Sequence, residues 1–262
     1  MDSRHADIAE RGSRAVEALR GSAGWVERKL RSDGPELLDL ASTPVRVRQQ
    51  ILDDLEKMAR WLLVKPFWMK HIGKLIQEAR VPRQGKPVRV LDVGAGHGGL
   101  LFAIGDWARK RRVPVELHGV EFDPKSVETA RRVAFEEGRK VSFVVGDARA
   151  LPFEAEGMDV VVTTFMLHHL PPGDVARVLA EMDRVAASNF FAFDVRRAFS
   201  VLPALWTFLR LGAFEAPTRH DAVVSLRRAY STEEIRVLLA AGGVEQSAVK
   251  TVRPAYFIAS RR

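Results

Sequence analysis

The most informative segment of the chain reads Val88-Arg-Val-Leu-Asp-Val-Gly-Ala-Gly-His-Gly-Gly99. Its first half is apolar and rich in β-branched residues, which is typical of a buried strand. A helical pattern of apolar residues follows the glycines directly, at Leu100, Leu101 and Ile104. Glycines allow positive φ and a close approach of ligand to backbone, and the start of the helix offers unpaired N–H groups and a positive dipole end. The segment therefore predicts a strand, a turn and a helix that together bind an adenosine-type cofactor.

The following hundred residues alternate between strand and helix patterns, which predicts a parallel sheet with helices on both faces. Further strands are expected at 115–121, 141–147, 158–165 and 189–195, and helices at 100–110, 124–138 and 172–187. In an open sheet of this kind, ligands bind beyond the carboxyl ends of the strands. Glu121 and Asp147 lie at two of those ends, so both are candidates for contacts with the cofactor.

Two motifs in this region match patterns of a known family. Asp92, Gly94, Gly96 and Gly98 fit D-x-G-x-G-x-G, and the segment from Met158 to Leu170 is similar to F-D-x-V-x-x-x-x-x-L-H-H-L, with Met158 where the family often has Phe. On these motifs the chain resembles the class I S-adenosylmethionine (SAM) dependent methyltransferases, in particular small-molecule enzymes of bacterial secondary metabolism and of the quinone-biosynthesis type. The resemblance covers about residues 85–195. It implies an α/β, Rossmann-like fold with a seven-stranded, mostly parallel sheet whose last strand is antiparallel.

The resemblance implies SAM as the cofactor and S-adenosylhomocysteine (SAH) as its product. The glycines also fit the G-x-G-x-x-G pattern of dinucleotide-binding proteins, which is weak evidence when it stands alone. Asp92 favours SAM, because a carboxylate repels a pyrophosphate and attracts an ammonium or a sulfonium. In the family this acid holds the methionine end, while acids placed like Glu121 and Asp147 contact the ribose hydroxyls and the adenine amino group. Each acid taken alone also fits a turn residue or a helix cap. The predicted cofactor-binding residues are Asp92, Gly94, Ala95, Gly96, Gly98, Glu121, Phe122, Asp147, Ala148, Thr164 and Phe165.

Histidines are the candidate catalytic residues. Methyl transfer requires that the two reactants are positioned and, for a hydroxyl acceptor, that a base removes a proton. His169 and His168 follow the fourth strand, where substrate and methyl group should meet, and His220 lies in a later segment. Imidazole has a suitable unperturbed pKa; the alternatives are a histidine pair that only supports its loop and, for His220, a solvated turn. No metal is predicted, because the fourth strand ends in Thr163-Thr164 rather than in carboxylates.

The flanking segments are expected to cover the active site. The expected domains are an N-terminal helical cap (1–84) and a SAM-binding methyltransferase domain (85–262) that contains a substrate-covering insertion (196–230). In the cap, Pro66 is expected to end one helix and another to span 67–80. Residues around Trp61 to Trp68 and around Phe199 to His220 are expected to meet above the methyl group, because both segments are too apolar to be solvated loops. Trp68 and Trp206 are the residues whose replacement is expected to impair methyl transfer. The alternative is that these aromatic residues only pack as core.

Composition restricts the class of protein and its partners. The chain has 262 residues, of which 47% are hydrophobic and 28% charged, a mix typical of globular domains. It has no cysteine, which excludes disulfides and methylation of pyrimidine C5 through a cysteine adduct. The net charge of +8 is compatible with nucleic acid or an anionic surface, but no basic stripe is interleaved with aromatic residues, so nucleic acid is not expected as a partner.

The sequence also predicts where the protein acts. Residues 1–13 contain no apolar core segment, which predicts no signal peptide, and the longest apolar stretches are strand-sized, which predicts no membrane span. The cytoplasm is therefore the expected location, and the oligomeric state is left open.

The expected substrate is a small, partly hydrophobic metabolite, because the cap and the insertion are apolar. Thr164-Phe-Met-Leu167 stands where amino-directed nucleic-acid enzymes have Asn/Asp-Pro-Pro-Tyr/Phe, so that chemistry is disfavoured. O-methylation by in-line transfer is expected, because oxygen is the commonest acceptor among the enzymes that the chain resembles; nitrogen and carbon stay open. Two alternatives are an RNA or protein methyltransferase and a SAM-binding scaffold or regulator without turnover.

Overall fold

A seven-stranded sheet runs through the protein in the order β3-β2-β1-β4-β5-β7-β6, in a computed structural model that describes residues 3–32 and 34–261. The first five strands pair in parallel, and β7 is antiparallel to both β5 and β6. The predicted mostly parallel sheet with an antiparallel last strand is confirmed. The strands are β1 (Val88–Val93), β2 (Val115–Glu121), β3 (Val141–Val145), β4 (Met158–Thr164), β5 (Ala186–Val195), β6 (Ser247–Val252) and β7 (Tyr256–Arg261).

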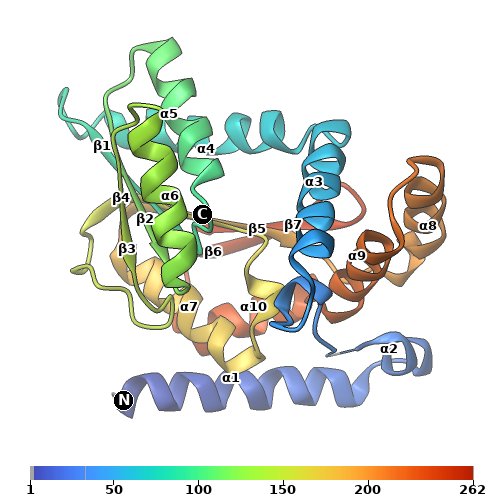
Figure 1. Ribbon diagram of the computed structural model, residues 1–262. Helices are drawn as coiled ribbons and strands as arrows, with labels where there is room; N and C mark the ends of the chain where they lie inside the picture. Colours follow the sequence, from blue (N-terminus) through green and yellow to red (C-terminus); the bar gives the residue numbers. More distant parts are fainter. Residues whose placement is uncertain (1–2, 33, 262) are drawn as a thin grey trace.

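Helices cover both faces of the sheet (Figure 1). Among the described residues, none of them combines the length and apolarity needed to cross a membrane. The α-helices are α1 (Ser3–Ser22), α2 (Trp25–Leu30), α3 (Val45–Trp61), α4 (Val64–Arg80), α5 (Gly99–Arg111), α6 (Pro124–Glu136), α7 (Pro172–Val185), α8 (Leu202–Leu211), α9 (Ala216–Arg228) and α10 (Thr232–Ala241). Short 3₁₀ helices are η1 (Leu37–Asp39), η2 (Leu167–His169) and η3 (Phe199–Val201).

Two apolar clusters, one on each face, hold the sheet between its helices. Alternate residues of a strand point to opposite faces, so Val88 and Val90 of β1 pack with α4, α5 and α6, whereas Leu91 and Val93 pack with α7, α10 and α1. All four side chains are fully buried, and each stabilises the fold by about 1.5–3 kcal/mol relative to an exposed position. Both faces are therefore core, and the ligand-binding region lies at the strand ends.

The N-terminal segment reaches the site by a long route. α1 lies across α7 and α10 (Figure 1), where Arg20 forms an ion pair with Glu234 at 2.7 Å. Residues 1 and 2, which belong to the segment predicted to lack a signal peptide, lie outside the described residues. After α2 the chain passes through η1 to α3 and α4. Of the predicted cap, η1, α3 and α4 approach the strand ends, and α1 packs elsewhere.

The predicted helix end at Pro66 is wrong. α3 ends at Trp61, where Leu63 adopts a left-handed conformation with φ of 51° and breaks the helix. Pro66 lies in the first turn of α4, where its missing N–H leaves no intrahelical hydrogen bond unmade. The corner between the two helices thus comes before the proline rather than at it.

Candidate active site

The glycine turn between β1 and α5 has the backbone conformation that its sequence requires. Gly94, Gly96 and Gly98 have φ of 75°, 52° and 85°, a region that residues with a side chain rarely adopt. A Cβ atom on Gly98 would also lie only 2.6 Å from the ring of Phe143. The Gly96 N–H donates to the Glu121 carboxylate at 2.9 Å, which ties the turn to the end of β2. The predicted strand, turn and helix are therefore present.

A cavity of about 450 Å³ adjoins the turn at the carboxyl ends of the strands. We call it the cofactor cavity. It is lined by Asp39, Gly94, Val120, Glu121, Phe122, Gly146, Asp147, Ala148, Arg149, Phe165, Met166, His169 and Leu170. Six predicted cofactor residues are in this lining, namely Gly94, Glu121, Phe122, Asp147, Ala148 and Phe165. The other five, Asp92, Ala95, Gly96, Gly98 and Thr164, are not in this lining and belong to β1, the turn and the end of β4.

Asp92 is buried at the end of β1, with 3% of its surface exposed. Burial, and then repulsion from the nearby Glu121 carboxylate, raise the pKa of Asp92 to about 8, because both disfavour a further negative charge. A cationic group that entered the cavity would relieve this repulsion and favour the ionised form. The electrostatic environment therefore suits an ammonium or a sulfonium and opposes a pyrophosphate.

Arg149 is a cavity residue that the sequence did not single out. It forms a bidentate ion pair with Asp147, in which Nε donates to Oδ1 at 2.9 Å and Nη2 to Oδ2 at 2.7 Å, and a further ion pair with Asp174 at 3.0 Å. Hydrogen bonds from Arg149 hold the pKa of Asp147 below its usual value. Asp147 is thus ionised at the cavity wall, and its contact with an adenine amino group stays a prediction.

A second cavity, of about 360 Å³, shares Phe165 and His169 with the cofactor cavity. We call it the acceptor cavity. Its walls are mainly apolar and come from α3, α4, α8, α9 and the end of β5. The apolar lining residues are Leu38, Leu55, Met58, Ala59, Leu62, Val64, Trp68, Phe165, Val195, Leu205, Ala222, Leu226, Ala255 and Tyr256, and the polar ones are Glu36, His168, His169 and Ser225.

Phe165 is held between the two cavities in an unusual backbone conformation. Its φ is 54°, which is uncommon for a residue with a large side chain. Its N–H donates to the Phe193 carbonyl at 3.0 Å, and its ring packs edge-on against Trp68 and Phe193. Backbone strain of this kind persists where the surroundings fix it and gathers at functional sites. The aromatic cluster therefore sets the position of the side chain that both cavities share.

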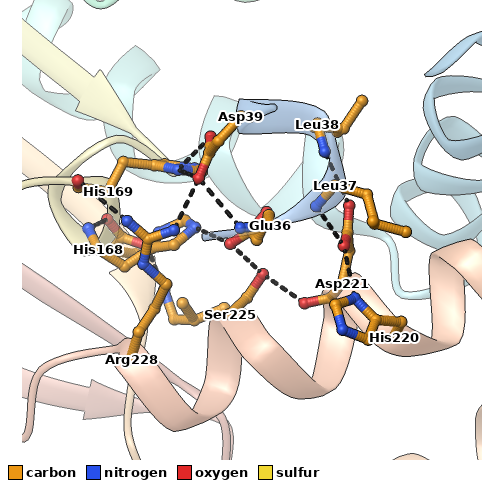
Figure 2. A network of polar contacts seen from close by, with 12 residues as sticks. Glu36, Leu37, Leu38, Asp39, His168, His169, His220, Asp221, Ser225 and Arg228 are labelled. Carbon is orange, nitrogen blue, oxygen red and sulfur yellow. Dashed lines mark hydrogen bonds and ion pairs between the residues drawn. The ribbon is translucent and has the colours of Figure 1, made fainter. Parts of the chain in front are cut away.

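His168 is part of a buried ion-pair network (Figure 2). Its Nδ1 lies 2.6 Å from Asp194 and its Nε2 lies 3.4 Å from Glu36, which also accepts a hydrogen bond from Ser225 at 2.7 Å. Burial lowers the pKa of His168, but the Asp194 and Glu36 carboxylates outweigh it and raise the pKa to about 9. At neutral pH the ring therefore carries both protons and has no lone pair with which to act as a base.

His169 has a different environment, although it is the next residue in η2. About a third of its side chain is exposed, and it lines both cavities. Its Nδ1 lies 3.1 Å from Asp39, so a proton on Nδ1 leaves the lone pair on Nε2. Of the two neighbouring histidines, His169 has the exposure and the free nitrogen that a base requires.

The structure does not bring His220 and Trp206 to either cavity. His220 lies on α9 beside Asp221, with about half of its side chain exposed. Trp206 is 56% exposed, whereas the preceding Leu205 lines the acceptor cavity. Successive helical residues point about 100° apart, so α8 turns Leu205 inward and Trp206 outward. The prediction that Trp206 covers the substrate is therefore corrected; Trp68 lines the acceptor cavity, and its contact with substrate stays a prediction.

Glu36, His168 and His169 also have their ligand atoms within 4.8 Å of one another. A divalent metal requires deprotonated ligands with a free lone pair. The raised pKa of His168 opposes this, because its ring carries a proton on each nitrogen between two carboxylates. We therefore assign the cluster as an ion-pair network that joins the N-terminal segment to β5.

Comparison with known proteins agrees with this geometry. A family model described as a methyltransferase domain matches residues 90–189. Ajmaline N-methyltransferase of Rauvolfia serpentina is 34% identical over 106 residues, which are 40% of this chain and 34% of the plant enzyme. Aklanonic acid methyltransferase DauC of Streptomyces sp. (strain C5) is 32% identical over 144 residues, 52% of this chain and 61% of that enzyme. The matched part thus spans less than two thirds of either relative.

Solved structures share the fold over a longer part of the chain. The plantazolicin methyltransferase BamL, in complex with a triazolic desmethylPZN analog and SAH, has a TM-score of 0.60 and covers 94% of this chain and 98% of that chain at 12% identity. At this identity the likeness concerns the fold alone. The glycine turn and the strand order thus agree with the match of residues 90–189 to a methyltransferase domain.

Proposed function

We propose that the protein is a SAM-dependent methyltransferase that acts on a small, partly apolar molecule, with oxygen as the acceptor atom. The observation that carries this proposal is the pair of cavities, whose linings have Phe165 and His169 in common. A cofactor in one cavity and an acceptor in the other would meet at these two side chains. The matched relatives are named for the methylation of ajmaline and aklanonic acid, which supports a small molecule as the substrate.

The cofactor cavity fits SAM in its charge. Burial and the Glu121 carboxylate raise the pKa of Asp92, and a cation near both acids would favour the ionised form of Asp92. When bound, SAM supplies an electrophilic methyl group on a sulfonium. Glu121 accepts one backbone N–H on each carboxylate oxygen, from Gly96 and Asp123, and a carboxylate has further lone pairs for ribose hydroxyls.

The acceptor cavity provides the other two features that methyl transfer needs, a binding surface for the substrate and a base. Its apolar walls bind and orient a hydrophobic skeleton and exclude water from the reacting groups. His169 would accept the proton of the acceptor hydroxyl on Nε2, and the oxygen would then be a better nucleophile toward the methyl group that bound SAM supplies, with SAH as the leaving group. Phe165 lines both cavities and would position the two ligands relative to each other, which would contribute to the rate.

Replacing Glu121 tests the cofactor site. Glu121→Ala should weaken SAM binding by about 1–3 kcal/mol, the range for losing hydrogen bonds to a charged group. Isothermal titration calorimetry with SAM, SAH and NAD(H) measures this change. Glu116→Ala is a matched control, because Glu116 is exposed on the same strand and away from the cavity. Tighter binding of NAD(H) than of both SAM and SAH would contradict the assignment.

Replacing Trp68 tests the acceptor cavity. Trp68→Ala removes a wall residue that also contacts Phe165, so methyl transfer should slow by about tenfold or more through lost positioning, while SAM affinity stays nearly unchanged. Trp25→Ala is the control, because Trp25 is 65% exposed on α2 and lines neither cavity. If Trp68→Ala only lowered the melting temperature and kept normal kinetics, the residue would be core packing alone.

A further inference from the structure

The segment from Glu36 to Leu40, which we call the strap, adds a carboxylate to the site from outside the sheet. We propose that Asp39 is the positioning residue for His169 and that the strap thereby completes the active site. This inference rests on the proposed role of His169 as the base. In sequence the two residues are 130 positions apart.

The contact between Asp39 and His169 is direct. The Oδ1 and Oδ2 atoms of Asp39 lie 3.1 and 3.3 Å from Nδ1 of His169, and Asp39 itself lines the cofactor cavity. An ionised carboxylate at this place accepts the Nδ1 proton, fixes the tautomer with a lone pair on Nε2, and stabilises the imidazolium that forms when Nε2 takes a proton. These are the properties that a base needs from its partner.

The charge of Asp39 is secured by a second cation. Arg228 donates to Asp39 at 2.7 Å and to the His169 carbonyl at 3.1 Å, so one guanidinium fixes both partners. Burial raises the pKa of Asp39, but the hydrogen bonds from His169 and Arg228 outweigh it and hold that pKa well below its usual value. The carboxylate is therefore ionised at every pH at which a histidine base works.

The place of the strap is set by polar contacts from α3 and α9, of which Figure 2 shows those made by Asp221 on α9. Buried Asp221 accepts the Leu37 and Leu38 N–H groups at 2.8 and 3.2 Å. Arg48 donates to the Leu38 and Leu40 carbonyls at 2.7 and 2.9 Å. These contacts fix the backbone on both sides of the Asp39 side chain. The insertion, through α9, thus positions the strap.

Two carboxylates on the strap serve the two histidines differently. Glu36 contacts His168, which is buried and protonated, whereas Asp39 contacts His169, which lines the cavities. Asp39 also accepts the Glu36 N–H at 3.2 Å and so closes the η1 turn. A test must therefore separate the charge of Asp39 from its role in this turn, and asparagine does so because its carbonyl can still accept that N–H.

The test compares full-length Asp39→Asn, Asp39→Glu and Asp53→Asn, the last an exposed acid on α3 that serves as the control. With SAM and an accepted substrate, Asp39→Asn should lower kcat by about 10- to 100-fold, with little change in KM. This loss is smaller than the full contribution of a general base, because His169 itself is still present. Asp39→Glu should restore part of the rate.

A double-mutant cycle decides whether Asp39 acts through His169. His169→Ala combined with Asp39→Asn should be no slower than His169→Ala alone. Additive losses, or a normal kcat in Asp39→Asn, would overturn the role of Asp39. If His169→Ala itself kept full activity, the base role in the proposed function would fail instead, so the two failures can be told apart.

Discussion

Replacing His169 by alanine should slow methyl transfer by about a hundredfold or more, the usual contribution of a general base. The ring lines both cavities and presents Nε2 as the nitrogen free to take a proton. Single-turnover rates with saturating SAM measure the effect, because they exclude product release. SAM affinity should change far less than the rate, since the loss arises in the transition state.

His220→Gln is the matched control for this experiment. His220 also pairs with a neighbouring aspartate, but it is half exposed and outside both cavities, so its replacement should leave the rate near that of the unchanged protein. A large loss in His220→Gln together with normal kinetics in His169→Ala would reverse the assignment of the base.

Replacing His168 by leucine should affect stability above all. The change leaves Asp194 and Glu36 without their shared cation, and removing one partner of a buried ionic group costs about 3–5 kcal/mol. For a chain of this size the melting temperature should fall by roughly 6–20 °C. Calorimetric melting measures it, with His169→Leu as the control, because that neighbour is partly exposed and its loss should cost much less.

His168 also makes the free energy of unfolding depend on pH, in a direction that can be stated. The pKa of His168 is raised from 6.5 in the unfolded chain to about 9 in the folded one. The folded state therefore holds the proton more tightly, and the contribution is fully present below pH 6.5 and lost as the pH rises through 9. The free energy of unfolding, measured in urea between pH 6 and pH 10, should fall more steeply for the unchanged protein than for His168→Leu. Parallel curves would show that His168 carries no such charge.

The fold could be predicted because its signals are local. The alternation of strands and helices, and the glycines that follow Asp92, lie in one continuous stretch and fix the sheet and the cofactor turn. The boundary near Pro66 was misplaced, because a proline in a first turn and a proline that ends a helix look alike in sequence. The apolar stretch 196–230 predicted an insertion. It did not indicate which of Leu205 and Trp206 faces the cavity, because both side chains are apolar.

The candidate site could be predicted only in part, because some of its residues are brought together only by tertiary contacts. Glu121 and Asp147 follow strands and could be found, whereas Asp39 and Glu36 reach the histidines through a turn held by Asp221. No periodicity or motif marks these two acids. The sequence also could not rank His168 and His169, since their difference arises from Asp194 and from exposure to the cavities.

The measurement that tests the account most directly is methyl transfer from methyl-labelled SAM to a metabolite extract freed of protein and nucleic acid, followed by mass spectrometry of the labelled products. We predict label in an apolar small molecule, on oxygen, at a rate that falls by about a hundredfold in His169→Ala. Parallel incubations contain RNA or protein in place of the extract. Label that appears only in RNA or protein, or tight SAM binding with no transfer to any of the three pools, would contradict the account.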